Sequence, residues 1–478
     1  MSTFSGLSTA LSSLIAQRQA IDVTGQNIAN ARTPGYTRQR ADLQSVQALS
    51  APTLHSNKQT VGNGVVTTGI TRIGDIFLDS RVRAESSSAG FSAARAGVLG
   101  RIESSIDEPS DTGVSAQLQA FWAGWQDLSG SPQESATRRV LLGEAQNLVA
   151  QISDGYRVTE TQWSQLRTET QTLVTNLNST AESVADLNKQ IRAILVSGGA
   201  ANELMDQRDL LVTELSSLAG AQARHREDGT VDVMLSGNAI VSGINTHKVE
   251  VTGSFTMAGG IGQPPAALDQ VALRWAGSGT ALTLEGGRLA SNVAELAPAD
   301  QGGSLAIAAD AWNALATKIH GSVNALHGTG QTLTDPPGPA GDFFALAAGQ
   351  PAATGLSVAI SDPWQIAAGV AANGALDGSL GDRIAQLGAA PDGPDAQWRE
   401  YVVDLGVRTR QATTRAGVIE ASRQTAEQIQ LSYTSVDIDE ETTNLLAMQR
   451  SYEGAARVLT AIDEMLDVLI NRTGVVGR

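Results

Sequence analysis

Apolar residues near both ends of the chain recur with the three- and four-residue spacing of a heptad repeat. The N-terminal repeat has two exceptions, Arg18 and Gly25, whereas the C-terminal repeat has none. A stripe of two apolar positions per heptad is typical of helices that pair in a coiled coil. The pattern therefore predicts a helix of about 30 residues at each end. The apolar positions are Phe4, Leu7, Leu11, Leu14, Ile21 and Ile28 in the first helix, and Leu445, Met448, Tyr452, Ala455, Leu459, Ile462, Leu466 and Leu469 in the second.

The two predicted helices are natural partners, so we expect them to pair; the alternative is that each packs separately on the body of the protein. Because only the N-terminal stripe is interrupted, we predict that the C-terminal helix is the more fully buried of the two. Because each helix has only about 30 residues, an isolated pair would be only modestly stable. We therefore expect the pair to be loose in the free chain and to order when neighbouring subunits add apolar contacts.

An acid-rich run at residues 437–441 marks the predicted start of the C-terminal helix. Carboxylates in a first turn interact favourably with the positive end of the helix dipole. Asp437 and Glu440 also have the spacing of a capping box, while Glu441 breaks the apolar stripe where it is extended backward beyond Leu445. We interpret these acids as ordinary helix-start residues and not as a pair for acid–base catalysis.

The pattern changes several times between the two ends. Turn residues and a Val/Thr/Ile-rich run predict an extended segment after the first helix, and a long helical stretch follows. Alternating apolar residues beside the Asp228-Gly229 turn then predict strands. The sequence thus predicts a mainly α protein with a β-rich insertion and a discontinuous helical bundle built from both halves of the chain. The expected parts are residues 1–78 with 434–478 as a terminal coiled-coil domain with an extended linker, residues 79–220 with 291–433 as the helical body, and residues 221–290 as the insertion.

Composition excludes several classes of function. The chain has no cysteine, which rules out disulfides, thiolate metal sites and cysteine nucleophiles. Its net charge is −16 and it has no basic tract, so we expect neither nucleic acid nor a membrane surface as a partner. The N-terminus lacks a basic stretch before its apolar residues, and no run of 18 apolar residues occurs. We therefore expect no cleavable signal peptide and no membrane span.

No combination of residues predicts catalysis, a cofactor or a metal site. The glycines at 62–64 lack the continuation of a phosphate-binding loop. His320 and His327 lie seven residues apart, without the spacing or the carboxylate of a zinc site. Trp122 and Trp125 lie in an apolar helical segment, which favours a core role over a sugar-binding platform. We expect no enzymatic activity.

The segment after the first predicted helix, GQNIANARTPGYTRQ at 25–39, carries a family resemblance. Pro34-Gly35 is a turn that stops the helix. The segment resembles the N-terminal signature of the bacterial flagellar axial proteins, which include rod, hook and hook-associated proteins. It departs from that signature at Gln26 and Arg32.

Further segments resemble the hook-associated protein 1 family within that group. The first, G-x-G-V-x4-I-x-R-x2-D-x-F-L, contains Arg72, Asp75, Phe77 and Leu78. The others are residues 206–209, 228–229, 343–344 and 436–458. Members often insert a large outer β domain after the Phe-Phe pair, and here that stretch is short. The resemblance therefore implies a reduced or absent outer domain.

The resemblance implies a structural subunit that joins the flagellar hook to the filament as a ring. Its partners would be other copies of itself, the hook protein, the next hook-associated protein on the filament side and an export chaperone. It would be extracellular, exported through the flagellar type III apparatus. The alternatives are a hook or rod protein and a cytosolic coiled-coil scaffold. The expected assembly determinants are the apolar stripes together with Asn27, Ile28, Asn30, Pro34, Gly35 and Tyr36.

Overall fold

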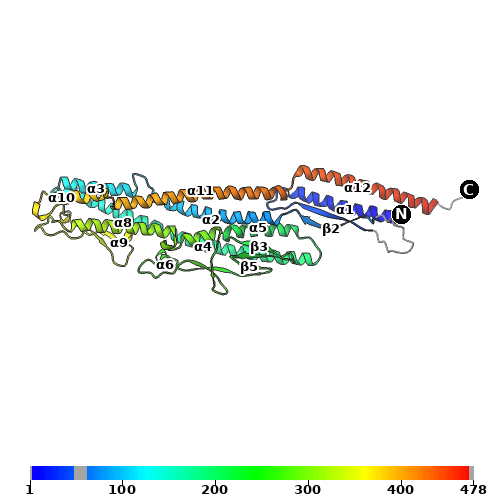
Figure 1. Ribbon diagram of the computed structural model, residues 1–478, viewed down its shortest axis with the longest axis horizontal. Helices are drawn as coiled ribbons and strands as arrows, with labels where there is room; N and C mark the ends of the chain where they lie inside the picture. Colours follow the sequence, from blue (N-terminus) through cyan, green and yellow to red (C-terminus); the bar gives the residue numbers. More distant parts are fainter. Residues whose placement is uncertain (1–2, 48–61, 473–478) are drawn as a thin grey trace.

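The computed structural model describes residues 3–47 and 62–472, with side chains described for 6–47 and 62–470. The molecule is elongated, its long helices run along its length, and both ends of the chain lie at the same end of the molecule (Figure 1). The long helices are α1 (Thr3–Asn30), α2 (Ile76–Ile106), α3 (Val114–Gly130), α4 (Ser135–Val196), α5 (Asn202–Ala219), α8 (Ser304–His327), α11 (Pro394–Thr434) and α12 (Ile438–Asp467). The short helices are α6 (Met257–Ile261), α7 (Gly287–Glu295), α9 (Ala352–Gly355) and α10 (Ser379–Ala385).

The strands form small antiparallel sheets and no large one within the described ranges. A hairpin-like pair, β1 (Gln39–Ser45) with β2 (Val65–Arg72), lies beside α1. A four-stranded sheet contains β3 (Gln222–His225), β4 (Val231–Leu235), β5 (Asn238–Ser242) and β6 (Asn245–Thr246) in that order. A three-stranded sheet contains β7 (Val249–Thr252), β8 (Ala272–Trp275) and β9 (Ala281–Leu282). The last pair is β10 (Phe344–Leu346) with β11 (Leu356–Val358).

The helical body has an apolar core at the end far from the termini. Helices α3, α4, α8, α10 and α11 enclose it, and Trp122 and Trp125 belong to it, as the sequence predicts. The two residues of the Phe-Phe pair, Phe343 and Phe344, are fully buried against Phe121. Aromatic side chains are few in this chain, and this core collects many of them.

A second core lies between the four- and three-stranded sheets, α5 and the later half of α4. Residues Val231, Val233 and Leu235 point inward from β4, which confirms the alternation seen in the sequence. Helix α4 is 62 residues long and contributes to both cores, so it connects them as one continuous element. Between the Phe-Phe pair and α11, the described residues form only short elements.

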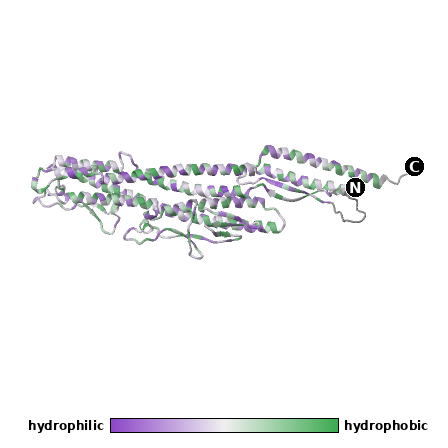
Figure 2. Ribbon diagram, viewed as in Figure 1, coloured by the Kyte–Doolittle hydropathy of each residue, from purple (hydrophilic) through white to green (hydrophobic). Residues whose placement is uncertain are grey.

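The terminal helices α1 and α12 lie side by side and antiparallel (Figure 1). A Cβ on Gly6 would lie 3.2 Å from Ile462 at the outer end, and Thr24 Oγ1 lies 3.6 Å from Met448 Sδ nearer the body. Apolar positions alternate with polar ones along both helices (Figure 2). Neither helix joins the two apolar cores of the body.

The predicted asymmetry between the two terminal helices is wrong for this chain. Among its described side chains, residues 6–30, helix α1 buries six, whereas α12 buries only Glu441 and Ile462. The reason is that β1 and β2 cover a second side of α1, while α12, among the elements that the structure describes, packs mainly against α1. The buried positions of α1 are Ala10, Ala16, Ala20, Val23, Thr24 and Asn27.

The predicted N-terminal stripe is also displaced from the face that the helix buries. Leu7, Leu14, Ile21 and Ile28 are half-buried and Leu11 is 51% exposed. Small side chains occupy the buried face because a helix and a hairpin approach α1 closely together. Along α12, by contrast, the predicted positions are mostly the least exposed ones of the helix.

Within the described ranges, no helix combines the length and the apolar character that a membrane span requires.

Candidate functional site: a polar joint between the terminal helices and the body

The end of α1, the start of α12, the strands β1 and β2 and the start of α5 meet where the terminal helices join the body (Figure 1). We call the polar network at this place the joint, and define it by Asn27, Tyr36, Arg38, Gln39, Arg72, Asn202, Glu203, Asp206, Asp209, Glu440 and Glu441. Its residues belong to neither of the two apolar cores described above, and polar contacts position the elements there.

Asn27 is the centre of the joint and is 1% exposed. Its Nδ2 donates to the Gln39 carbonyl oxygen at 2.9 Å and to Glu441 Oε2 at 3.0 Å. Its Oδ1 accepts from the Tyr36 hydroxyl at 2.9 Å and from the Gln39 N–H at 3.0 Å. A buried amide that satisfies all four bonds fixes the positions of its partners, because each unmade bond would leave a buried polar group. One side chain thus ties together α1, the turn, β1 and α12.

Arg38 joins the turn to the start of α12. It donates from Nη1 and Nη2 to the two oxygens of Glu440, at 3.1 and 3.0 Å. Its Nε lies 2.9 Å from Glu441 Oε1. The hydrogen bond to Glu440 and the charges of both acids raise the pKa of Arg38, although partial burial opposes this. A bidentate guanidinium–carboxylate pair also has a defined geometry, so the pair with Glu440 adds to the buried contact with Glu441 in orienting α12.

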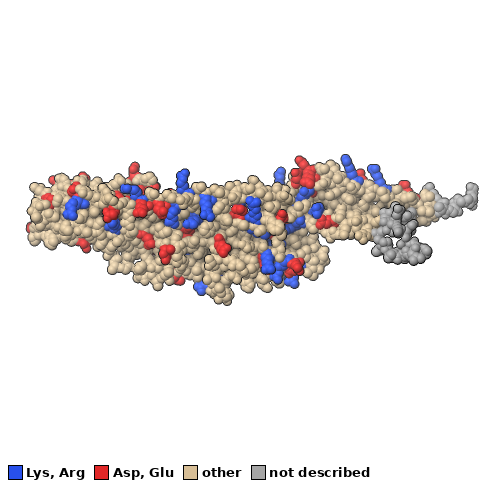
Figure 3. All heavy atoms as spheres, in the orientation of Figure 1, with Lys and Arg blue, Asp and Glu red and all other residues tan. Residues whose placement is uncertain are grey.

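The acidic residues at the start of α12 have two different roles, which the sequence alone does not distinguish. Asp437 caps the helix, accepting from the N–H groups of Asp439 and Glu440 at 2.9 and 3.2 Å. Glu440 does not complete a capping box with its side chain, because it pairs with Arg38. Glu441 lies in the first turn, as we interpreted it, but it is also 2% exposed and bonded to Asn27 and Arg38, a role that we did not predict. The exposed acids form a visible group where α12 begins (Figure 3).

A second set of contacts connects the joint to α5 of the body. Asp206 Oδ2 accepts from the Thr37 N–H at 3.0 Å, and its Oδ1 accepts from Arg72 at 2.8 Å. Arg72 also donates to Asp209 at 2.8 Å. Gln39 donates to Glu203 and accepts from Asn202, both at 3.0 Å. The turn and the strand pair are therefore held by α5 on one side and by α12 on the other.

The turn itself follows from its residues. Gly35 has φ +76°, in the left-handed region that favours glycine, and a Cβ there would collide with Leu210 of α5. Tyr36 N–H bonds back to the Thr33 carbonyl oxygen at 3.1 Å. The Arg38 N–H donates to the Thr434 carbonyl oxygen at 2.9 Å, at the break between α11 and α12. The predicted Pro34-Gly35 turn thus ends α1 and fixes the break between the last two helices.

The surroundings in the joint raise the pKa values of Tyr36 and Asp206. Burial, and then the charges of Glu203, Asp206 and Glu441, raise the pKa of Tyr36 to about 12. Burial also raises the pKa of Asp206 above its usual value, although the hydrogen bond from Thr37 and the charge of Arg72 lower it. Asp209 and Asp206 raise the pKa of Arg72 despite its own burial. These groups hold each other in place.

The structure brings some of the predicted assembly residues into the joint and leaves others outside it. Asn27 and Tyr36 are in the joint, Pro34 and Gly35 form the exposed turn beside it, and Asn30 bonds only within its own turn. The side chain of Phe4 lies outside the described part of the chain. On α12, Ile462 is buried, Tyr452 is exposed, and Leu445, Met448, Ala455, Leu459 and Leu466 are half-buried. Leu469 lies in the short helix η5 (Val468–Arg472) that follows α12, and it is exposed.

Sequence reasoning missed the charged residues of the joint as site residues. Arg38, Arg72, Asp206 and Glu441 all fall inside the motif segments that carried the family resemblance. Their periodicity gives no indication of contact, because they come from four separate elements. The family motifs in which these residues lie were the only feature of the sequence that could have indicated their role.

The remaining candidate chemistry is structural. His327 is buried, with Nδ1 2.7 Å from the Gly341 carbonyl oxygen and Nε2 accepting from the Ala367 N–H at 2.9 Å. Burial lowers its pKa. It is therefore a neutral core histidine that joins α8 to the following loops. Among the residues described, no group of three or more His, Asp or Glu could hold a metal ion.

Models of known protein families match three parts of this chain. The family model for the flagellar hook-associated protein FlgK helical domain matches residues 99–344. The models for the flagella basal body rod protein and for the flagellar basal body rod FlgEFG protein C-terminal region match residues 7–37 and 428–472. The matches at residues 7–37 and 428–472 meet at the joint, and the match at residues 99–344 lies in the body.

Individual relatives agree with the family models. The chain is 29% identical to flagellar hook-associated protein 1 of Bacillus subtilis (strain 168), with all of both chains covered. It is 28% identical to flagellar hook-associated protein 1 of Escherichia coli (strain K12), over 51% of this chain and 44% of that one. The solved flagellar hook junction protein FlgK from Burkholderia pseudomallei shares the fold, with a TM-score of 0.61 at 15% identity over 74% of this chain and 100% of that one. The chain therefore belongs to the flagellar hook-associated protein 1 family, whose members are structural proteins of the bacterial flagellum.

Proposed function

We propose that this chain is a subunit of the junction between hook and filament, and that the terminal helix pair with its joint is the element by which it assembles. The joint carries this proposal, because it fixes the direction of the terminal pair relative to the body through buried, fully bonded groups. The terminal segments match rod-protein models, so this part is of the kind that axial subunits share.

The outer surface of the terminal pair supports assembly with other copies. Large apolar side chains are exposed there on both helices, and contact with neighbouring copies would remove their apolar surface from water. They would be covered by neighbouring subunits in a ring, and the two helices would then complete a coiled coil. The exposed apolar residues are Leu11 and Ile15 on α1 and Leu446, Tyr452, Val458 and Met465 on α12.

The proposed division of labour follows from where the cores lie. Residues 1–78 with 434–478 would form the axial part, residues 79–220 with 291–433 the body, and residues 221–290 an insertion on its side. The two-core body would make lateral contacts as a stiff unit, with a reduced or absent outer domain. The joint would transmit load between the axial helices and the body.

The proposal includes partners and a route. The chain would contact the hook protein on one side and the next hook-associated protein on the other. It would leave the cell through the flagellar type III apparatus without a cleavable signal peptide, guided by an export chaperone, and act outside the cell.

Deletion of the gene tests this function. The proposal requires hooks that lack filaments, with flagellin released into the medium, and restoration of filaments when the intact gene is supplied. Normal filaments on the deletion strain would contradict it. Hooks missing together with filaments would point instead to a hook or rod subunit.

A further inference from the structure

A groove of about 470 Å³ runs along one face of α2, between α7 and α11. Its floor is apolar because small residues of α2 line it, and its walls carry charged side chains from α4, α7 and α11. Ala93 and Gly97 are exposed, so part of this floor is open to solvent. The floor residues are Ala89, Gly90, Ala93, Ala94 and Gly97.

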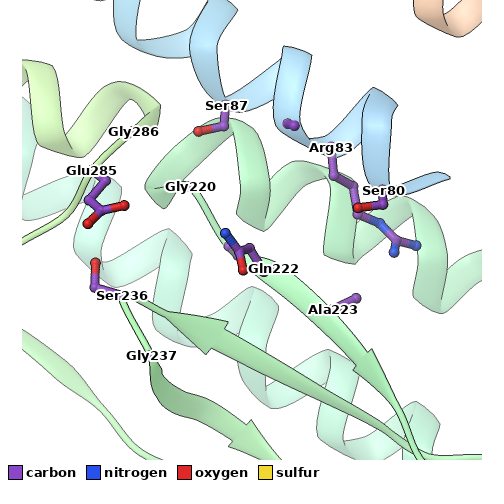
Figure 4. Close-up of a pocket in the computed structure, with 12 residues that line it drawn as sticks. Ser80, Arg83, Ser87, Gly220, Gln222, Ala223, Ser236, Gly237, Glu285 and Gly286 are labelled. Atoms are coloured by element: carbon purple, nitrogen blue, oxygen red, sulfur yellow. The ribbon is translucent and has the colours of Figure 1, made fainter. Parts of the chain in front are cut away.

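A second groove lies nearer the start of α2 and has a different character. Ser80 and Arg83 from α2 and Gln222 from β3 lie around it (Figure 4). Its lining is mostly polar, and Arg83 is paired with Asp209 at 3.6 Å. The apolar floor between α7 and α11 is therefore the groove of α2 that suits the apolar side chains of a partner.

The charged walls of this groove leave one arginine without a partner. Glu169 pairs with Arg288 at 3.1 Å, and Glu420 pairs with Arg423 at 2.8 Å. Arg101 also lines the groove, and it has no ion pair with any residue that the structure describes. An anionic group that enters the groove beside Arg101 would therefore be attracted to it.

Asn292 of α7 is a second group of the groove that lacks a partner. It lines the groove and is 1% exposed, and its Nδ2 has no acceptor among the described residues. Buried polar groups are ordinarily hydrogen-bonded. An occupant of the groove could supply the missing acceptor with a main-chain carbonyl oxygen.

An apolar projection stands on the segment around α6. Phe255 is 74% exposed and Leu268 is 56% exposed, and the Ser254 N–H, which donates to the Asp269 carbonyl oxygen at 2.9 Å, brings the two residues together. The Phe255 ring lies over the guanidinium of Arg167, with 4.5 Å between the ring centroid and Cζ, and Arg167 is itself 2% exposed. The ring is thus held in place before any partner arrives, which lowers the entropic cost of binding. We call Phe255, Leu268 and the exposed Asp269 the knob.

The knob and the groove lie at the same height on α4 and on opposite sides of it. Arg167, which supports the knob, and Glu169, which lines the groove, are two positions apart in α4. Successive residues of a helix are turned by about 100°, so these two side chains point in nearly opposite directions. Helix α6 lies along one long side of the molecule and α11 along the other (Figure 1). Copies placed side by side at equal height would therefore bring the knob of each one against the groove of the next.

We propose that the knob of one copy docks in the groove of a neighbouring copy of this chain, with Asp269 beside Arg101. Phe255 and Leu268 cover the apolar floor, and the carboxylate pairs with the arginine that has no partner in its own chain. The contact joins two different surfaces, so it repeats from copy to copy and can close a ring. This inference rests on the proposed function, because the junction supplies the ring of copies.

Cysteine cross-linking tests the contact, because the chain contains no cysteine and introduced thiols are its only ones. The full-length chain with Leu268→Cys and Ala93→Cys, both at exposed positions, replaces the native chain in cells. Hooks that carry the junction are isolated and treated with a short bis-maleimide. A ladder of covalent multimers is expected on a denaturing gel, whereas each single variant should give monomers. Leu268→Cys with Val196→Cys is the matched control and should give no ladder, because Val196 is 83% exposed but lies about 40 Å from Glu169 along α4.

A charge exchange in the same cysteine pair tests the orientation of the knob. Arg101→Glu should remove the ladder, because it places a carboxylate against Asp269, and Asp269→Arg added to it should restore the ladder. Junctions that contain the cysteine pair but yield monomers would overturn the proposal, and so would a ladder from the Val196 control or one that Arg101→Glu leaves unchanged. Each of these results leaves the proposed function intact, since the chain is then present in the junction. Absence of the native chain from isolated hooks would contradict the proposed function itself, and this inference with it.

Discussion

Arg38 Nη2 lies 2.7 Å from Glu441 Oε1, although 403 positions separate these residues in the sequence. The contact joins the two ends of the chain, because it links the turn after the first helix to the first turn of the last helix. Both residues also bond to others in the joint, so the contact is one part of a connected network. The end of α1 and the start of α12 are consequently held at a fixed position on the body.

Replacing Glu441 by Gln should loosen the terminal pair. The amide keeps the shape but loses the charge that Arg38 and Asn27 face in a buried place, and we expect a loss of about 1–3 kcal/mol. Glu440→Gln is the matched control, since Glu440 is 56% exposed and an exposed pair contributes about 1 kcal/mol at most. Hydrogen exchange of the α1 and α12 amides measures both. Equal protection in the two variants would mean that burial of Glu441 has no energetic role.

Replacing Asn27 by Asp should be more damaging than any other single change at the joint. The variant loses both Nδ2 donors and places a second carboxylate beside Glu441, so we expect about 3 kcal/mol or more of lost stability. Asn30→Asp, whose bonds are exposed, should change stability by less than about 0.5 kcal/mol. Thermal unfolding compares the two. A similar shift in melting temperature for both would show that the Asn27 network is not required for folding.

The stability of the joint should fall at high pH through Tyr36. Its folded pKa, about 12, lies above the unfolded value of about 10. The folded state therefore holds the phenol proton more tightly, which stabilises it below pH 10, and this contribution is lost as the pH rises through 12. The difference in ultraviolet absorbance between the parent chain and Tyr36→Phe isolates this phenol. Titration of that difference near pH 10 would contradict the burial and the negative surroundings of Tyr36.

Substituting Gly35 by Ala should strain the turn. A residue with a Cβ at this positive φ costs about 1–2 kcal/mol, and here the Cβ also meets Leu210. Gly25→Ala is the opposite case, because Gly25 is helical and nothing lies within 4 Å of its Cβ position, so it should stabilise the chain by about 0.5–1 kcal/mol. Denaturant unfolding of the two variants should give changes of opposite sign. Changes of the same sign would mean that the turn is not held in the observed conformation.

The sequence predicted the elements better than their contacts. Periodicity located the terminal helices, the strands at 231–235 and the buried tryptophans, because each depends on residues close together in the chain. It misplaced the buried face of α1, because that face is set by β1 and β2, which approach from a separate segment. Ala16 and Ala20 are small and do not stand out as an apolar stripe in the sequence, although both lie on the buried face of α1.

The joint shows why charged sites are difficult to predict from spacing. Glu441 interrupts an apolar pattern, and its burial makes sense only when Asn27 and Arg38 are placed beside it. These residues come from both ends of the chain, and no periodic pattern relates them. The family resemblance pointed to the correct segments, whereas the pairing of their side chains needed the fold.

Charge reversal at Arg38 tests most directly whether the joint directs assembly at the junction. Arg38→Glu would place a third carboxylate against Glu440 and Glu441, whereas Arg32→Glu changes an exposed arginine of the same turn region. Each variant would be supplied to a strain that lacks the native gene, its export measured in the medium, and the fraction of hooks that carry filaments counted by electron microscopy. The account predicts exported protein but few filaments with Arg38→Glu, and a normal fraction with Arg32→Glu. A normal fraction of filaments with Arg38→Glu would contradict it.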